Sequence, residues 1–134
     1  MSRSGYSDDY NGWELVRWRG AVASSIRGRR GQAFLREMLD ALNAMPDKRL
    51  IRSELQSESG EVCALGSVGL KRGADMTALD PEDYESVAQF FGIPPTLVRE
   101  IEFENDEFWD LRTESPEARW CRVRDWVRAR LKTP

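Results

Sequence analysis

The sequence predicts a mainly α-helical, compact domain with a helix-turn-helix-like unit and room for one short β-hairpin. Apolar residues recur every three or four positions through most of the chain, which is the spacing of a helix with one buried face. Proline, glycine and capping side chains separate these stretches. A length of 134 residues fits one domain that can bury a core without metal or disulfides. We expect residues 1–10 to form a flexible N-terminal tail and residues 11–134 to form a single helical domain.

Two helices are predicted in the first third of the chain. The first carries apolar residues at helical spacing, namely Leu15, Trp18, Val22 and Ile26. Gly28 is a plausible end for it. The second lies in "AFLREMLDALNAM", residues 33–45, whose wide apolar stripe is ended by Pro46. Three residues of this stripe are expected in the core: Phe34, Leu39 and Leu42.

The next stretch is ambiguous. "RLIRSELQSESGEVCAL", residues 49–65, alternates weakly around a Ser-Gly turn signal, which predicts a short β-hairpin. Leu50, Ile51 and Leu55 in the same stretch also suit a helix. A short helix is expected near "ALGSVGLKRG", with Gly73 as its cap.

Three further helices are predicted from the residues that begin and end them. Asp80 is predicted to cap a helix that has Pro81 at its first position and ends at Gly92. Pro94 and Pro95 can occupy the first turn of another helix, which continues through four apolar residues: Leu97, Val98, Ile101 and Phe108. The last helix opens with Ser115 and Pro116 and carries apolar residues at helical spacing: Trp120, Val123, Val127 and Leu131.

Residues 84–103 resemble a helix-turn-helix core. The small, turn and apolar positions of that motif are occupied by Ala88, Gly92, Val98 and Ile101. In that family the second helix enters the major groove, and its early side chains meet base edges. Here the early positions are Pro94, Pro95, Thr96 and Arg99, and acidic residues follow them. Carboxylates near phosphates oppose DNA affinity, so we interpret the unit as a packing motif.

The composition argues against an enzyme. Histidine is absent, and with it the commonest general base and zinc ligand. The sequence contains no phosphate-binding glycine loop, no "GxSxG" elbow and no cysteine pair at zinc spacing. Glu100, Glu104 and Glu107 could share a helical face near Mg²⁺, but their spacing fits no EF-hand loop and a solvated acidic face is the better interpretation. We therefore predict a binding protein without catalytic residues, cofactor or metal.

The sequence gives no sign of membrane association. No apolar run approaches the ~20 residues of a membrane-spanning helix, and the first residues lack the apolar stretch of a signal peptide. We expect a soluble cytoplasmic protein, in which Cys63 and Cys121 stay reduced.

Charge is strongly segregated along the chain. Residues 15–36 carry six arginines and no acid, residues 75–110 carry eleven acids and one arginine, and residues 115–134 carry six bases and two acids. Three interpretations compete. In the first, the charges pair inside the fold or are solvated and contribute little. In the second, "RGRRG" contacts phosphates together with Lys71, Arg72 and the C-terminal arginines, with glycine allowing close backbone approach and Trp18 or Trp120 available for stacking. In the third, the acidic segment presents carboxylates to a basic partner.

These interpretations name two candidate surfaces. The acidic partner-binding surface comprises Glu100, Glu102, Glu104, Asp106, Glu107 and Asp110. The alternative nucleic-acid contact comprises Arg27, Arg29, Arg30, Arg36, Lys71 and Arg72. A net charge of −3 favours the acidic surface, and we expect weak or no direct nucleic-acid binding.

Several motifs occur in an order that resembles a protein family. They are "RGRRGQAFLRE", "GEVCALG", "LDPEDY", "FENDE" and "RWCRVRDWV". The chain is similar, over residues 13–132, to a group of small, largely uncharacterised proteins encoded by tailed bacteriophages and prophages. The resemblance implies no catalytic or ligand-binding residues. It implies a phage accessory protein in the cytoplasm of an infected bacterium, which binds a host protein or ribonucleoprotein complex and inhibits a host defence, as anti-CRISPR proteins do, or a nucleic-acid-handling complex.

Overall fold

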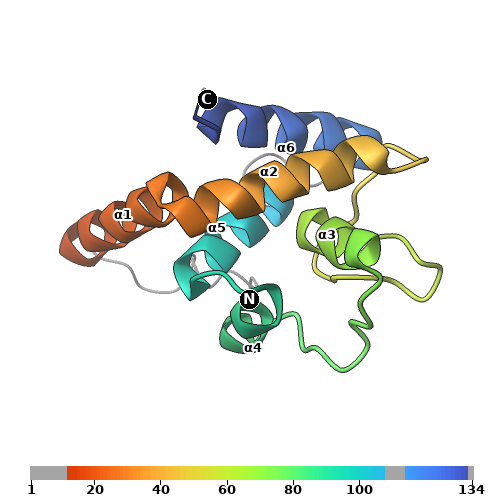
Figure 1. Ribbon diagram of the computed structural model, residues 1–134, viewed down its shortest axis with the longest axis horizontal. Coiled ribbons are helices and arrows are strands. Elements are labelled where there is room, and N and C mark those ends of the chain that lie inside the picture. Colours follow the sequence, from red (N-terminus) through yellow and green to blue (C-terminus); the bar gives the residue numbers. More distant parts are fainter. Residues whose placement is uncertain (1–11, 108–113, 133–134) are drawn as a thin grey trace.

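The structure of the protein is a computed structural model that describes residues 12–107 and 114–132 (Figure 1). The described part of the chain is mainly helical, as predicted, and contains no β-strand. Its helices are α1 (Gly12–Arg27), α2 (Arg29–Ala44), α3 (Ala64–Arg72), α4 (Tyr84–Phe91), α5 (Pro95–Asp106) and α6 (Pro116–Arg130). The predicted tail and Phe108 lie outside the described residues. None of the described helices is long and apolar enough to cross a membrane.

The helices pack around α5. Figure 1 shows α1 and α2 following one another along the long axis, with α6 beside α2. α2 packs against α6 and α3, while α5 contacts α1, α3, α4 and α6. α2 and α6 run antiparallel, because the Trp120 indole near the start of α6 donates to the Leu42 carbonyl near the end of α2 (3.2 Å), and Gln32 near the start of α2 bonds to Arg130 at the end of α6. This arrangement places the charged ends of three helices close together.

The core stripe of α2 differs from the prediction at one position. Phe34 and Leu42 are buried as expected, together with Leu35 and Met38. Leu39 is only half-buried and packs against the edge of the core. The fully buried residues Leu35, Met38 and Leu42 follow one another at intervals of three and four and define the centre of the stripe, and Leu39 lies one position to its side.

The junction of α1 and α2 depends on a close backbone approach. Gly28 has an extended conformation, with ψ 162°, which interrupts the helical path between the two helices. A Cβ atom on Gly31 would lie 1.8 Å from the Ser25 carbonyl oxygen, so only glycine fits there. This glycine of "RGRRG" therefore serves the contact between two helices, and not the approach of a phosphate that the sequence suggested.

The predicted hairpin is reduced to a single antiparallel bridge between Gln56 and Val62. Ser57 N–H donates to the Glu61 carbonyl (2.8 Å), which closes the turn between them. Ile51 N–H also donates to the Val62 carbonyl (3.0 Å) across the turn. Leu50 N–H, however, donates to the Pro116 carbonyl (3.1 Å), so the pairing ends before it can form a strand.

The predicted helix-turn-helix-like unit is present as α4 and α5. Gly92 ends α4 in the left-handed conformation, with φ 75°, as its position predicted. Ala88 is buried where the two helices pack. The predicted start of α4 is wrong, because Asp83 is the N-cap and accepts from Ser86 N–H. Asp80 instead accepts from Glu82 N–H (2.9 Å) in a preceding turn. For α6, the predicted cap is confirmed, since Ser115 accepts from Ala118 N–H.

Candidate functional site

The predicted acidic surface is largely inside the protein. Glu102, Glu104 and Asp106 are 0%, 5% and 4% exposed, so the expectation that they form a solvent-facing row is wrong. Glu100 and Glu107 are half-buried, and Asp110 lies outside the described residues. The physical reason is the position of α5, which other helices cover on several sides. A helix of mixed polarity can be central when its polar groups find partners there.

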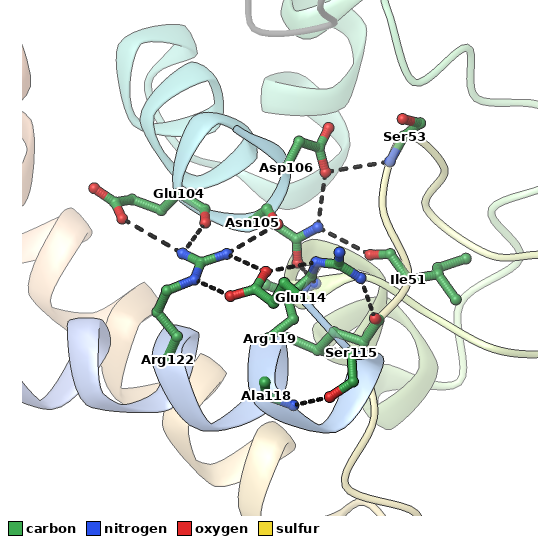
Figure 2. Close-up of polar contacts among 12 residues, drawn as sticks. Ile51, Ser53, Glu104, Asn105, Asp106, Glu114, Ser115, Ala118, Arg119 and Arg122 are labelled. Carbon is green, nitrogen blue, oxygen red and sulfur yellow. Dashed lines mark hydrogen bonds and ion pairs between the residues drawn. The ribbon is translucent and has the colours of Figure 1, made fainter. Parts of the chain in front are cut away.

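The end of α5 is one place where such partners are found (Figure 2). Asp106 accepts from the Ser53 backbone N–H (3.2 Å) and from the Asn105 side chain (2.8 Å). The Asn105 side chain also donates to the Ile51 carbonyl (2.9 Å) and accepts from Ala64 N–H (3.0 Å) at the start of α3. These bonds attach the loop before α3, and α3 itself, to α5. Sequence reasoning did not single out Asn105, because a lone polar residue in an acidic run gives no signal of burial.

Arg122 fastens α5 to α6. Its guanidinium forms a bidentate pair with Glu114 (2.6 and 3.0 Å) and also donates to the carbonyls of Glu104 and Asn105, near the C-terminal end of α5 (Figure 2). A cation at that end suits the helix dipole. The hydrogen bond from Arg122 lowers the pKa of Glu114, against the opposing effect of burial. Arg119, also buried, reaches both Glu114 and the Leu50 carbonyl. Glu114, Arg119 and Arg122 therefore form structural contacts inside the fold.

Glu104 is the buried carboxylate with the most altered ionisation. Burial, followed by the charge of Glu100, raises the pKa of Glu104 to about 7, while Arg130, Arg122 and the Trp126 indole act in the opposite direction. The salt bridge between the Glu104 carboxylate and Arg122 is 3.9 Å long. Glu104 can therefore change its charge near neutral pH.

The recognition positions of the helix-turn-helix-like unit are used internally. The Thr96 hydroxyl lies 2.6 Å from the Ser25 hydroxyl of α1. Arg99 is 9% exposed, and its guanidinium lies over the rings of Trp18 (4.4 Å) and Tyr84 (4.7 Å). These contacts join α5 to α1 and α4. The geometry supports the interpretation of this unit as a packing motif.

A different cluster of charged residues is exposed where the end of α6 meets the α1–α2 junction. The Gln32 side chain donates to the carbonyls of Ile26 (2.8 Å) and Arg130 (3.0 Å), and it accepts from Lys132 N–H (2.8 Å). The Lys132 ammonium donates to the Arg27 carbonyl (2.7 Å). These contacts bring together three segments of backbone that carry six exposed cations, which we call the basic corner: Arg27, Arg29, Arg30, Arg128, Arg130 and Lys132.

The salt bridges between described residues do not include the charges of the basic corner. All six side chains are exposed, and within residues 12–107 and 114–132 none of them forms a salt bridge. Arg29 and Arg30 occupy the first positions of α2, whose first turn contains no acid and has no side-chain cap. Cations at a helix N-terminus are disfavoured by the helix dipole, by about 0.3–1 kcal/mol each. Helix stability therefore does not explain why these two arginines are there.

Not all of the predicted nucleic-acid residues belong to this corner. Arg36 is exposed one helical turn beyond Gln32 on α2. Lys71 and Arg72 lie on α3, which packs against α2 separately from α6. Arg72 forms a bidentate pair with Glu37 (both 2.7 Å), so its charge is largely compensated. The sequence named the C-terminal arginines only as a group, because the contact that brings them to the corner spans about a hundred residues.

The tryptophans expected to stack on bases are covered. Cations lie over the ring of Trp120, which is 5% exposed, and Arg130 lies over the ring of Trp126 at 4.9 Å. Trp18 is half-buried beneath Arg99. Among the described residues, these rings therefore offer no open platform for unstacked bases.

A cavity of about 550 Å³ lies elsewhere, between the end of α2, the turn near Gly60 and α3. Its walls include the apolar side chains of Met45 and Leu70, and charged residues of both signs, such as Lys71 and Glu61. Its mixed charge does not extend the basic corner. In the described residues, no group of acidic or cysteine side chains is placed to hold a metal ion.

Comparison with known proteins does not indicate which of these features is the functional site. No protein-family model matches the sequence, and no curated protein or solved structure matches it either. The basic corner is therefore the candidate site on geometric and electrostatic grounds alone.

Proposed function

We propose that this protein is a non-enzymatic accessory protein that binds nucleic acid through the basic corner, without recognising base sequence. The observation that carries the proposal is the contact between three segments of backbone that carry six exposed cations, none of which forms a salt bridge within the described residues. Arginine is well suited to such contacts because its guanidinium forms bidentate hydrogen bonds with phosphate.

The binding energy would come mainly from the release of counterions. Each phosphate that the corner neutralises lowers the slope of log K against log salt by about 0.9 on duplex DNA. Sequence-independent binding of this kind gives dissociation constants of roughly 10⁻⁴–10⁻⁶ M at physiological salt. The weak binding expected from the sequence is therefore compatible with the proposal, and the salt dependence is its signature.

The net charge of −3 does not oppose this function, because five of the exposed acids lie in one segment away from the corner. The segment 75–85 forms the lower edge of the molecule in Figure 1, whereas α6 lies along the upper edge. Its exposed acids are Asp75, Asp80, Glu82, Asp83 and Glu85. Since the Debye length is about 8 Å at physiological ionic strength, charges on the far side of the protein act weakly on a bound phosphate.

The double helix is the favoured form of nucleic acid. Single-strand binders combine a basic groove with aromatic platforms on which bases stack. Here Trp120 and Trp126 are buried beneath cations, so backbone contact is what the corner offers. A double helix presents its phosphates without requiring unstacked bases.

In a second candidate function, the protein binds a host protein, as the phage resemblance implies. The acidic segment 75–85 is exposed, and it could contact a basic host protein in place of the buried carboxylates of α5. Such a protein would recognise the opposite edge of the molecule from the basic corner. The two candidates therefore differ in which edge of the protein must be altered to abolish binding.

The test is a fluorescence-anisotropy titration of a labelled duplex at several salt concentrations. The variant R29A/R30A removes two corner cations, and R52A/K71A is a matched control that removes two exposed cations elsewhere. We expect R29A/R30A to weaken binding and to make the salt slope shallower by about 1.8, whereas R52A/K71A changes it little.

Three results would contradict the proposal, two from the titration itself and one from competition. One is the absence of any binding by the wild-type protein even at low salt. The other is an equal loss in both variants, which would mean that only total charge matters. If polyglutamate competes as well as the duplex at equal charge, the corner binds acidic polypeptides and the assignment to nucleic acid fails.

A further inference from the structure

Gln32 connects every part of the basic corner. Its side chain is 8% exposed and uses all of its principal bonding groups. The amide nitrogen donates to the carbonyls of Ile26 in α1 (2.8 Å) and of Arg130 in α6 (3.0 Å). The amide oxygen accepts from the Lys132 backbone N–H (2.8 Å). One side chain of α2 thus holds the backbone of both neighbouring segments.

Apolar packing already holds the middle of α6, since Val127 is fully buried in the core. The last carbonyls of a helix have no partners within the helix and need them elsewhere. Gln32 supplies one to Arg130, and the Lys132 ammonium makes a second link, to the Arg27 carbonyl (2.7 Å). These two links hold the end of α6 beside α1 and α2.

We propose that Gln32 is a positioning residue, which holds the end of α6 against the α1–α2 junction so that the two groups of cations act as one site for a single stretch of phosphate backbone. The inference rests on the proposed function and deepens it. Binding is tighter when charged groups are already fixed in the bound arrangement, because less freedom is lost. Arg29 and Arg30 lie on α2 itself, whereas Arg128 lies on the segment that Gln32 holds.

This difference provides the test. Arg128 is exposed and forms no hydrogen bond or ion pair within the described residues, so R128A removes a charge without removing an internal contact. Q32M keeps the size of the side chain but cannot form the amide bonds. A double-mutant cycle on duplex DNA combines R128A with Q32M, and a second cycle combines R29A with Q32M. Q89M, on an exposed position of α4, is the matched control for the glutamine substitution.

We expect R128A to make the salt slope shallower by about 0.9 in the wild-type background and to have a clearly smaller effect in the Q32M background. R29A should have the same effect in both backgrounds, and in Q89M. A general loss of stability would affect both arginines alike, so the contrast between them reports positioning. Far-UV circular dichroism and urea unfolding check that each variant is folded. If Q32M is not folded, Q32N, which keeps the amide but shortens its reach, takes its place.

Additive effects of R128A and Q32M in a protein that binds duplex DNA would overturn the inference and leave the proposed function standing. A wild-type protein that binds no duplex would overturn the proposed function, and this inference with it.

Discussion

At the scale of single residues, Glu104 links the fold to pH. Its pKa rises from 4.5 to about 7 on folding, so the folded protein holds the proton more tightly than the unfolded chain. The stability that this group contributes is present in full below about pH 4.5 and is lost as the pH rises through about 7. We expect E104Q to remove this loss, so that its stability relative to wild type increases between about pH 5 and pH 8. Urea unfolding of wild type and E104Q at about pH 5 and about pH 8 measures this increase. A constant difference would contradict the assigned pKa.

Glu114 is predicted to behave in the opposite way. The hydrogen bond from Arg122 is the main cause of its lowered pKa, so its contribution to stability is present above the unfolded value of 4.5 and is lost as the pH falls through the folded value. The carboxylate is 5% exposed and serves Arg119 as well. Removing one partner of a buried ion pair leaves the other charge buried and unpaired. We therefore expect E114Q to lower the free energy of unfolding by roughly 3–5 kcal/mol near neutral pH. The same urea series should show this difference shrinking in acid; a difference that grows there would be evidence against the pair.

At the scale of elements, the core stripe of α2 gives a direct comparison between two leucines of one helix. Leu35 is fully buried, and Leu39 lies at the edge of the stripe. We expect L35A to lower the free energy of unfolding by about 2–5 kcal/mol. L39A, which leaves a smaller cavity because solvent already reaches the site, should lower it by less than about 2 kcal/mol. Equal losses in urea unfolding would mean that the stripe is assigned to the wrong face.

Helices could be predicted where local chemistry determines them. The cap at Ser115 and the left-handed Gly92 act within a few residues, so the sequence alone reveals them. Asp80 and Asp83 are equally good caps by composition, and only packing selects Asp83. The predicted hairpin is cut short because the Leu50 N–H donates to the Pro116 carbonyl, outside the stretch. Helix boundaries and strand pairings that depend on tertiary contacts could therefore not be predicted from local sequence patterns.

The candidate site depends even more on tertiary contacts that the sequence alone does not reveal. The sequence located a run of carboxylates but gave no sign of which face of α5 is covered, so Glu102 and Asp106 were expected in solvent and are buried. Arg27, Arg29 and Arg30 were identified because they are neighbours in sequence. Their association with Lys132 required a contact across 105 residues, which no local signal could reveal.

At the scale of the whole molecule, the fold converts charge segregation along the chain into separation in space. Five exposed acids lie in the segment 75–85 at the lower edge of the view in Figure 1, whereas α6, whose end belongs to the basic corner, lies along the upper edge. These two groups of opposite charge contribute a dipole despite the small net charge of −3. Such a field would orient the protein as it approaches a polyanion, with its acidic edge turned away.

The variant E82K/E85K tests this arrangement, because both side chains are exposed and neither belongs to the basic corner. At physiological salt, where the Debye length is about 8 Å, we expect duplex affinity to stay close to wild type. At 10 mM salt, where it is about 30 Å, removal of the distant repulsion should tighten binding and speed association. Anisotropy and stopped-flow titrations at both salt concentrations measure these effects. A large gain at physiological salt would place the acids beside the bound phosphates, contrary to the fold. A loss of binding to a basic protein partner, with duplex affinity retained, would instead favour the acidic edge as the working surface.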